Sequence, residues 1–241
     1  MRLALILLLA LCGSACRGNT MIANEAFPDP QVAALAQAAA DGNATRVAEL
    51  VAAGADPNAR GARGMGLLQF AMLAQSKPGL RALLANGADP NRPSSMNNDS
   101  AVHVAALADD PEYLEIVLAG GGDPDAPGEG SGTTPLAAAA GPRTDAQFRM
   151  LLAAGADPDR TDAVGNTALH TAAMINAGAH VLALLEAGAD PRARNRQGHS
   201  FQRYVFRTPE EKLTDEARAA RSAIREWLEA HDVPVEDPGA G

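Results

Sequence analysis

The apolar residues of this chain follow a helical pattern that recurs every 33 or 34 residues. Each recurrence precedes the tetrapeptide Gly-Ala-Asp-Pro or, once, Gly-Gly-Asp-Pro, and these begin at Gly54, Gly87, Gly121, Gly155 and Gly188. Seven, four and three residues before each glycine the chain is apolar, at the i, i+3, i+4 spacing of one buried helix face. These positions hold Val47, Leu50, Val51, Leu80, Leu83, Leu84, Leu114, Val117, Leu118, Phe148, Leu151, Leu152, Val181, Leu184 and Leu185.

The tetrapeptide predicts the end of each helix. Glycine just past the last helical turn adopts the left-handed conformation that ends a helix, and the proline makes the preceding aspartate extended. Nineteen residues before each glycine another apolar residue, followed by alanines, predicts a second helix: Leu35, Leu68, Val102, Leu136 and Leu169. One unit is therefore helix, short turn, helix, glycine stop and extended finger. A fixed period of this length predicts an all-α solenoid of stacked helix-turn-helix units.

Two units contain a more specific motif. The fifth reads DAVGNTALHTAA from Asp162 to Ala173, and the fourth reads GTTPL from Gly132 to Leu136. These segments resemble the ankyrin repeat, whose signature is D-x-x-G-x-T-P-L-H-x-A-A, and the resemblance covers about residues 30–207. It implies an ankyrin-repeat solenoid in which His103 and His170 tie adjacent turns together by hydrogen bonds.

The chain after the fifth unit departs from the repeat. We expect residues 31–207 to form about five ankyrin repeats and a partial sixth. Residues 208–232 are predicted to form a C-terminal capping helix, and residues 233–241 a loose tail. The apolar face of the capping helix is expected to hold Ala220, Ala223, Ile224, Trp227 and Leu228, with Trp227 as its packing anchor.

The first residues are typical of a targeting segment. Residues 1–15 combine a short basic start, the apolar run Leu3 to Leu11 and small residues before Cys16, which predicts a signal peptide. The end resembles a bacterial lipobox, although Gly13 stands where leucine is usual, and an ordinary signal cleaved after Ala15 is the alternative. A lipidated Cys16, with residues 16–30 as a polar tether, implies the periplasmic side of the cell envelope, and Arg17 favours the outer membrane.

Composition narrows the possible functions. Aromatic residues make up 3% of the chain, so we expect a core of Leu, Val and Ala without a large aromatic pocket. The net charge of −9 argues against general nucleic-acid binding. No apolar run reaches the 18 residues that favour a membrane-spanning helix, so we expect membrane contact only through a lipid anchor, and a monomer.

No motif for catalysis or metal binding is present in the sequence. The glycine-rich stretch from Gly128 to Thr134 lacks the lysine of a phosphate-binding loop, and a flexible finger is the simpler interpretation. We find no H-E-x-x-H, paired-cysteine or calcium-loop pattern, so we expect no metal, no cofactor and no enzyme activity. His180 and His231 are expected to be solvated on helix surfaces.

The resemblance implies that a partner protein contacts the finger tips and the ends of the first helices, on the concave face. The candidate partner-binding residues are Arg63, Met65, Leu73, Met96, Asn97, Asp99, Leu107, Val164, Asn166, Met174, Ile175, Arg196 and His199. The helix-end positions are apolar at Leu73, Leu107 and Met174-Ile175. The fingers also hold seven arginines, namely Arg60, Arg63, Arg92, Arg160, Arg192, Arg194 and Arg196. Alternatively, the apolar residues pack against their own fingers and the arginines are only solvated.

The sequence therefore predicts a non-catalytic protein-binding ankyrin scaffold in the bacterial cell envelope, of an immunity type or a scaffolding type. One alternative is a stress-related periplasmic protein that supports an envelope enzyme. The other is a small-molecule binder or an enzyme, which would need a cluster of titratable groups in a pocket.

Overall fold

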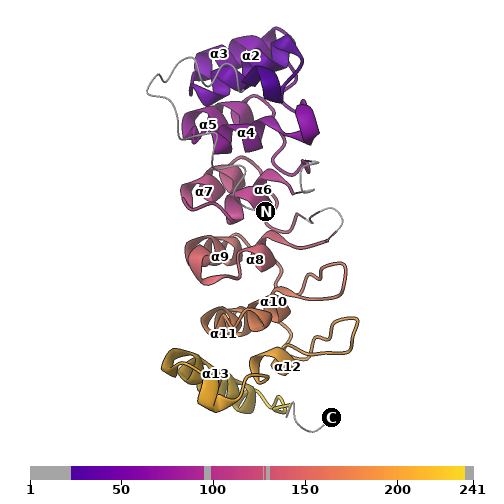
Figure 1. Ribbon diagram of the computed structural model, residues 1–241, viewed down its shortest axis with the longest axis vertical. Coiled ribbons are helices and arrows are strands. Elements are labelled where there is room, and N and C mark those ends of the chain that lie inside the picture. The colour runs from indigo at the N-terminus through magenta and orange to yellow at the C-terminus, as the bar shows by residue number, and fades with distance from the viewer. Residues whose placement is uncertain (1–22, 95–98, 127, 129–130, 237–241) are drawn as a thin grey trace. The chain divides into compact units, whose positions relative to one another are not determined.

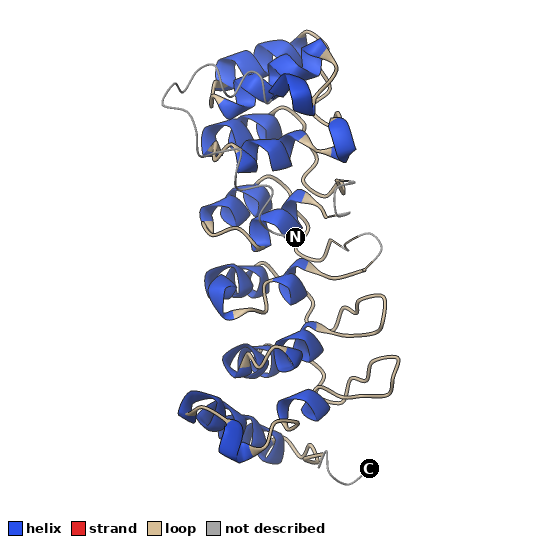
Figure 2. Cartoon of the chain, in the orientation of Figure 1, coloured by secondary structure: helices blue, strands red, loops and turns tan. Residues whose placement is uncertain are grey.

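The computed structural model describes residues 23–94, 99–126, 128 and 131–236. Over these residues the chain is helical and contains no strand, only an isolated bridge between Arg60 and Gly66 (Figure 2). The predicted all-α repeat fold is confirmed. The chain divides into two compact units, Met1–Asp89 with Ser94–Met96, and Pro90–Pro93 with Asn97–Gly241.

The first unit contains two helix pairs. Its helices are α2 (Pro30–Ala40), α3 (Ala44–Ala52), η2 (Ala62–Gly64), α4 (Leu67–Leu73) and α5 (Lys77–Ala85) (Figure 1). Helix α2 begins at Asp29, whose carboxylate accepts hydrogen bonds from the backbone N–H groups of Gln31 and Val32 at 2.8 and 3.1 Å. This cap satisfies amides that have no partner within the helix.

The second unit continues the pattern and ends in a longer helix. Its helices are α6 (Ala101–Ala106), α7 (Glu112–Ala119), α8 (Pro135–Ala138), η3 (Pro142–Thr144), α9 (Asp145–Ala153), α10 (Ala168–Met174), α11 (Gly178–Glu186), α12 (Gln202–Val205), η4 (Glu210–Lys212) and α13 (Asp215–Ala230). Within this unit α6, α8, α10 and α12 follow one another as the first helices of successive repeats, and α13 packs against α11 (Figure 1).

The core consists of the residues that the repeat pattern selects. The residues nineteen, seven and four positions before each glycine are buried in all five repeats. The position three residues before the glycine is half-buried in four repeats and buried at Leu185. The five glycines themselves have φ between +86° and +99°, which only glycine adopts without strain. The predicted helix stop is therefore correct.

Polar side chains connect the loops that follow these glycines. Asn58 donates to the Gly87 carbonyl at 2.9 Å and accepts from the Asp89 N–H at 2.7 Å, and Asn91 makes the same pair of bonds one repeat later. Asp125 and Asp159 occupy this position in the next two repeats, and each accepts a single backbone N–H. An ionised carboxylate has no hydrogen to donate, so it makes only half of the link.

Replacing Asp125 with asparagine is therefore expected to raise the free energy of unfolding by about 0.5–1 kcal/mol, because the amide adds a hydrogen bond to the Gly155 carbonyl. The reverse change, Asn91→Asp, is the matched control and should lose a similar amount. Urea unfolding measures both. Equal stability of Asp125→Asn and the wild type would contradict the expectation.

The described parts of the expected tether and of the expected loose tail are packed against the repeats. Of the expected tether 16–30, residues 23–30 are described, and Ala23 and Phe27 are buried. The Phe27 ring meets Phe70 edge to face with centroids 5.4 Å apart, in a space that the absent side chain of Gly61 leaves open. Of the expected loose tail 233–241, Val233 is buried and Glu236 is hydrogen-bonded to the last repeat. The expected signal segment and Cys16 lie outside the described residues.

The capping helix is anchored by residues other than the tryptophan. Trp227 is half-buried, and its ring stacks on exposed His231 with centroids 3.9 Å apart. Ile224 and Leu228 are the buried apolar side chains of α13, because the face turned toward α11 is centred on them. Trp227 is therefore not the packing anchor that the sequence predicted.

His180 is buried, which contradicts the expectation that it is solvated. Its Nδ1 lies 2.9 Å from the Ala140 carbonyl oxygen, its Nε2 lies 3.1 Å from the Asp145 carboxylate, and its ring packs on Phe148. The Arg149 hydrogen bond chiefly lowers the pKa of Asp145, His180 lowers it further, and partial burial opposes both. His180 thus connects two repeats through partners 35 and 40 residues away.

Candidate protein-binding face

The fingers of the fifth and sixth repeats are built on the same tight turn. The Asp162 carboxylate accepts from the N–H groups of Val164 and Asn166 at 2.9 and 2.7 Å, and Gly165 at φ +82° closes the turn. Asn195 does the same for Gln197 and His199 at 3.0 and 3.1 Å. The turns hold the intervening side chains, Val164 and Arg196, at the tips.

Neighbouring fingers of the second unit are joined through their backbones. The Ala163 N–H donates to the Ser131 carbonyl at 2.7 Å, and the Arg196 N–H donates to the Val164 carbonyl at 3.0 Å. Asn195 also donates from its amide to Asn166 at 2.9 Å. These bonds fix the spacing of successive finger tips, which a preorganised binding surface requires.

Two histidines attach fingers to the first helices. His103 Nε2 lies 2.7 Å from the Thr133 carbonyl oxygen and His170 Nε2 lies 3.0 Å from that of His199, while each Nδ1 faces a hydroxyl, of Ser100 and Thr167. The structural role that the resemblance implied for both is confirmed. Burial lowers the pKa of His170 below its ordinary value of 6.5, against the opposing effects of the His199 carbonyl and Asp162.

This pKa shift predicts a loss of stability in mild acid. Because the folded state disfavours protonated His170, the unfolded chain takes up the proton first as pH falls below about 6.5. The stabilisation is therefore complete above that pH and is lost progressively below it. Urea unfolding at pH 7.5 and 5.5 measures the effect, and His170→Gln should show a smaller decrease than the wild type. An identical decrease in the two proteins would exclude His170 as its source.

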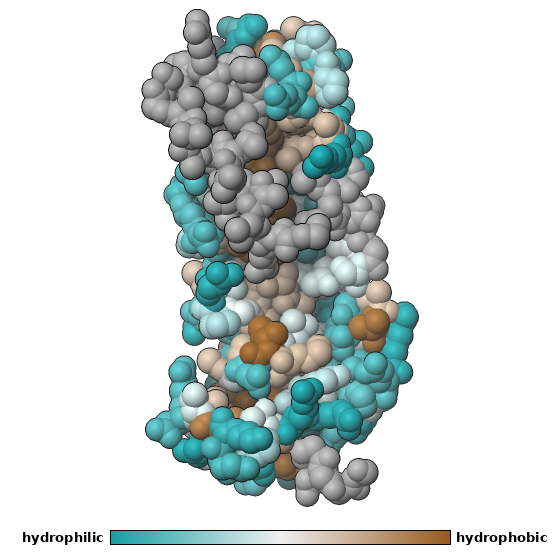
Figure 3. Space-filling view, in the orientation of Figure 1, coloured by the Kyte–Doolittle hydropathy of each residue, from teal (hydrophilic) through white to brown (hydrophobic). Residues whose placement is uncertain are grey.

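Large apolar side chains are exposed at the ends of the first helices in the second unit. Leu107 caps α6 and is 55% exposed, Met174 ends α10 and is 40% exposed, and Ile175 follows it at 49%. We call these three residues the exposed apolar row. The repeat between Leu107 and Met174 has Gly141 at the same position, so it adds no side chain to this row. Where Figure 3 shows the surface of this unit, most of it is hydrophilic and the hydrophobic patches are small and separate.

These residues are exposed, as the repeat register predicts. Val164, at the finger tip, is likewise 55% exposed. In the first unit Leu73, the last residue of α4, is 51% exposed. Leu73, Leu107 and Met174 therefore share one position of the repeat, at the end of the first helix.

The other candidate residues differ in availability. Arg63 is exposed at a finger tip in the left-handed conformation, with φ +55°, and Met65 beside it is half-buried. Arg196 is exposed, whereas Asp99 is half-buried. Met96 and Asn97 lie outside the described residues.

Asn166 and His199 belong to the scaffold of the fingers. Asn166 accepts from Asn195, and the His199 backbone carbonyl holds His170. Both are half-buried. Their internal bonds make them supports for the neighbouring tips.

The seven finger arginines are all exposed, but some have partners within the chain. Arg192 donates to the Asp232 carbonyl at 3.1 Å, and Arg194 donates to the Gly198 carbonyl at 2.8 Å and pairs with Glu236 at 2.7 Å. Hence Arg192 and Arg194 hold the C-terminal segment, whereas Arg196 projects from its finger tip.

Metal and membrane sites receive no support from the described residues. Among them, no group of three or more His, Cys, Asp or Glu side chains is placed to hold a metal ion. None of the helices in the described ranges is long and apolar enough to cross a bilayer.

The family model for ankyrin repeats, in three copies, matches residues 102–195. This chain contains ankyrin repeats. The match covers the third to fifth repeats, in which the signature residues are best developed, and no curated protein matches the sequence. Ankyrin repeats are scaffolds that bind other proteins, which agrees with the exposed apolar positions of this chain.

Solved structures share the fold at low sequence identity. The ankyrin repeat domain of Bcl-3, of the IkappaB family, aligns with a TM-score of 0.69 and 22% identity over 86% of this chain and 90% of that chain. An ankyrin repeat domain from Acinetobacter baumannii aligns with a TM-score of 0.67 and 24% identity over 83% of this chain and 98% of that chain. A chain of the complex between a predatory endopeptidase from Bdellovibrio bacteriovorus and an immunity protein aligns with a TM-score of 0.60 and 22% identity. The alignment covers 79% of this chain and 97% of that chain.

Several polar residues are buried without having been predicted to be so, among them His180, Gln202 and Arg221. Arg221 donates to the carbonyls of Thr208 and Val205, both at 2.7 Å, and burial lowers its pKa. Gln202 had a signal in the sequence, because it breaks the apolar column of the first helices at the sixth repeat.

Proposed function

We propose that this chain is a non-catalytic binding protein that captures one partner protein on the second unit's first-helix ends and finger tips. The observation that carries the proposal is the row of exposed apolar side chains, Leu107, Met174 and Ile175, on repeats whose core apolar residues are buried. The fixed fingers beside them supply a rigid surface, so little ordering entropy opposes binding.

Exposed arginines of the sixth repeat, which follows the repeat of Met174 and Ile175, favour an acidic partner surface. Arg196 at a finger tip, Arg203 in α12 and Arg207 after it are exposed, although the whole chain has a net charge of −9. Positive side chains around an apolar centre match an apolar knob surrounded by carboxylates. The partner proposed here has that chemistry.

The proposed place of action is the periplasmic side of the cell envelope, with a lipid on Cys16 as the anchor. This rests on the signal-like segment 1–15 and on the single cysteine that remains after its removal. In that setting the protein neutralises or scaffolds a secreted protein. The likeness to a chain from a complex between an endopeptidase and an immunity protein favours the immunity type.

Cysteine 16 provides a direct test of the anchor. Cys16→Ser should move the protein from the membrane fraction to the soluble periplasmic fraction, with an unchanged melting temperature, because only the lipid attachment is lost. Incorporation of a labelled fatty acid into the wild type, but not into Cys16→Ser, is the matching chemical measurement. A wild-type protein that is already soluble would favour ordinary signal cleavage after Ala15.

The partner is found by affinity purification from detergent-solubilised membranes with the wild-type protein as bait. A parallel purification with a Leu107→Ala, Met174→Ala double variant serves as the control. A genuine partner should be enriched by the wild type and depleted with the variant. A protein recovered equally with both would not use this face, and recovery of none would count against the proposal.

A further inference from the structure

The sixth repeat has a glutamine where the five preceding repeats have an aliphatic residue. Gln202 follows Leu169 by one repeat of 33 residues and lies in the same column as Val102 and Leu136. It is as buried as they are, with 2% of its surface exposed. A buried amide is costly unless its oxygen and nitrogen are both hydrogen-bonded, so the substitution calls for specific partners.

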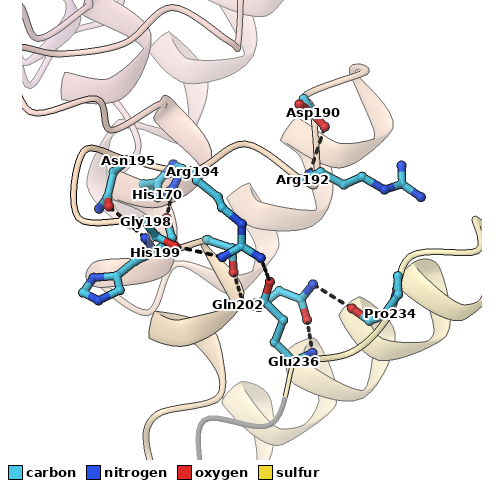
Figure 4. Close-up of polar contacts among 11 residues, drawn as sticks. His170, Asp190, Arg192, Arg194, Asn195, Gly198, His199, Gln202, Pro234 and Glu236 are labelled. Atoms are coloured by element: carbon cyan, nitrogen blue, oxygen red, sulfur yellow. Dashed lines mark hydrogen bonds and ion pairs between the residues drawn. The ribbon is translucent and has the colours of Figure 1, made fainter. Parts of the chain in front are cut away.

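The partners of Gln202 are backbone groups of the C-terminal segment (Figure 4). Its amide nitrogen donates to the Pro234 carbonyl at 3.1 Å, and its amide oxygen accepts from the Glu236 N–H at 2.8 Å. The side chain thus binds two backbone groups that are two residues apart. This is how a sheet edge recognises an extended peptide, without regard to the intervening side chain.

Two further residues bind a carboxylate at the end of this segment. Arg194 pairs with Glu236 Oε1 at 2.7 Å (Figure 4). Ser200, which is 1% exposed, donates its hydroxyl to Oε2. A second bond from Arg194 to the Gly198 carbonyl, at 2.8 Å, holds the guanidinium in place. Both carboxylate oxygens are therefore bound by charge-assisted hydrogen bonds, one of them within an ion pair.

We propose that Arg194, Ser200 and Gln202 form a binding slot for an extended acidic peptide, and that residues 234–236 occupy this slot as an intramolecular ligand. A partner that presents an extended segment ending in Glu takes the slot by displacing the chain's own tail. The tail then acts as a built-in competitor at the last repeat.

The character of the tail contacts distinguishes a displaceable ligand from a fixed cap. The apolar cap is complete at Val233, which is buried and whose N–H donates to the Leu228 carbonyl. After it, Pro234 is exposed and Val235 is half-buried, so the segment is held mainly by polar bonds. Displacing it exchanges one set of such bonds for another and exposes little apolar surface.

Tethering sets how strongly a partner must bind. Because the tail is attached by a short linker, its effective concentration at the slot is in the millimolar range. The apparent affinity of an external peptide is therefore its intrinsic affinity multiplied by the fraction of molecules in which the tail has left the slot. A variant with a weakened tail should therefore bind the same peptide more tightly. Weaker binding of the tail together with tighter binding of the peptide is the result expected if both occupy the same slot.

The test uses the full chain and an acetylated, fluorescent peptide with the sequence Val-Pro-Val-Glu-Asp-Pro, which reproduces residues 233–238. Fluorescence anisotropy should show about tenfold tighter binding to Glu236→Ala than to the wild type, because the tail of the variant loses the bonds that its carboxylate makes with Arg194 and Ser200. A peptide with glutamine in place of its glutamate should bind Glu236→Ala about tenfold more weakly. Adding Arg194→Ala to Glu236→Ala should remove the preference for the acidic peptide.

Gln202→Leu is the control for folding, because it restores the aliphatic residue of the other repeats. It should keep the melting temperature within a few degrees and lose peptide binding. The proposal is overturned if the peptide binds Glu236→Ala no better than the wild type. It is also overturned if Glu236→Ala or Gln202→Leu melts as early as a core-cavity variant, since the tail would then be part of the fold. Leu107→Ala should not change peptide binding, so this outcome is independent of the proposed function.

Discussion

Truncating Leu151 to alanine is expected to lower the free energy of unfolding by about 2–5 kcal/mol, the largest effect among these predictions. Leu151 is fully buried in α9, at the position that Leu184 occupies in α11. The lost methyl groups leave a cavity that the rigid helix pairs fill only partly. Urea or thermal unfolding followed by circular dichroism measures the loss.

The loss should extend beyond the repeat that carries the substitution. Each repeat is stabilised by its neighbours, so hydrogen exchange should become faster in α7 and α11 as well as in α9. Leu107→Ala is the matched control: it removes the same atoms from an exposed site and should change stability by less than about 0.5 kcal/mol. Unchanged melting of Leu151→Ala would mean that the repeat register is wrong.

Truncating the exposed apolar row is expected to have the opposite profile, with weaker partner binding and intact folding. Leu107→Ala and Met174→Ala should each cost roughly 1–3 kcal/mol of binding free energy, because each removes apolar area from the centre of an interface. A specific complex buries roughly 800 Å² on each partner, which this row and the adjoining finger tips would share. Calorimetry or surface plasmon resonance with the purified partner measures the affinity.

Controls separate the centre of the interface from its rim. Glu186→Ala, at the exposed end of α11, should leave affinity unchanged. Arg196→Ala should mainly slow association, and its effect should shrink in high salt because exposed charges are screened. If both Leu107→Ala and Met174→Ala bind as the wild type does, the row is not the contact surface.

The repeat register was predictable because each of its signals is local. Helix periodicity, glycine stops and alanine-rich first helices recur at one spacing, so five copies reinforce one another. The same register placed Leu107 and Met174 at helix ends, and the structure confirms that they are exposed. For Asn166 and His199 the register gave the correct position, but it gave no information on their bonds to neighbouring fingers.

The chain ends were predicted less well because they lie outside the repeat. Phe27 stands in a segment without periodicity, and its burial depends on the gap beside Gly61 and on the Phe70 ring. Glu236 likewise follows the last helix with no pattern around it. A segment that is ordered by contacts with distant residues has no local sign of that order.

By itself the sequence determined the period, the helix pairs, the apolar core positions and the exposed row of this protein. The tertiary structure alone decided which buried polar groups meet. Examples are His180 with Asp145, Arg221 with the Val205 carbonyl and Gln202 with the backbone of the tail. The physical reason is distance along the chain. These partners are 16 to 35 residues apart, and a buried polar side chain is tolerated only where the fold brings its partner to it.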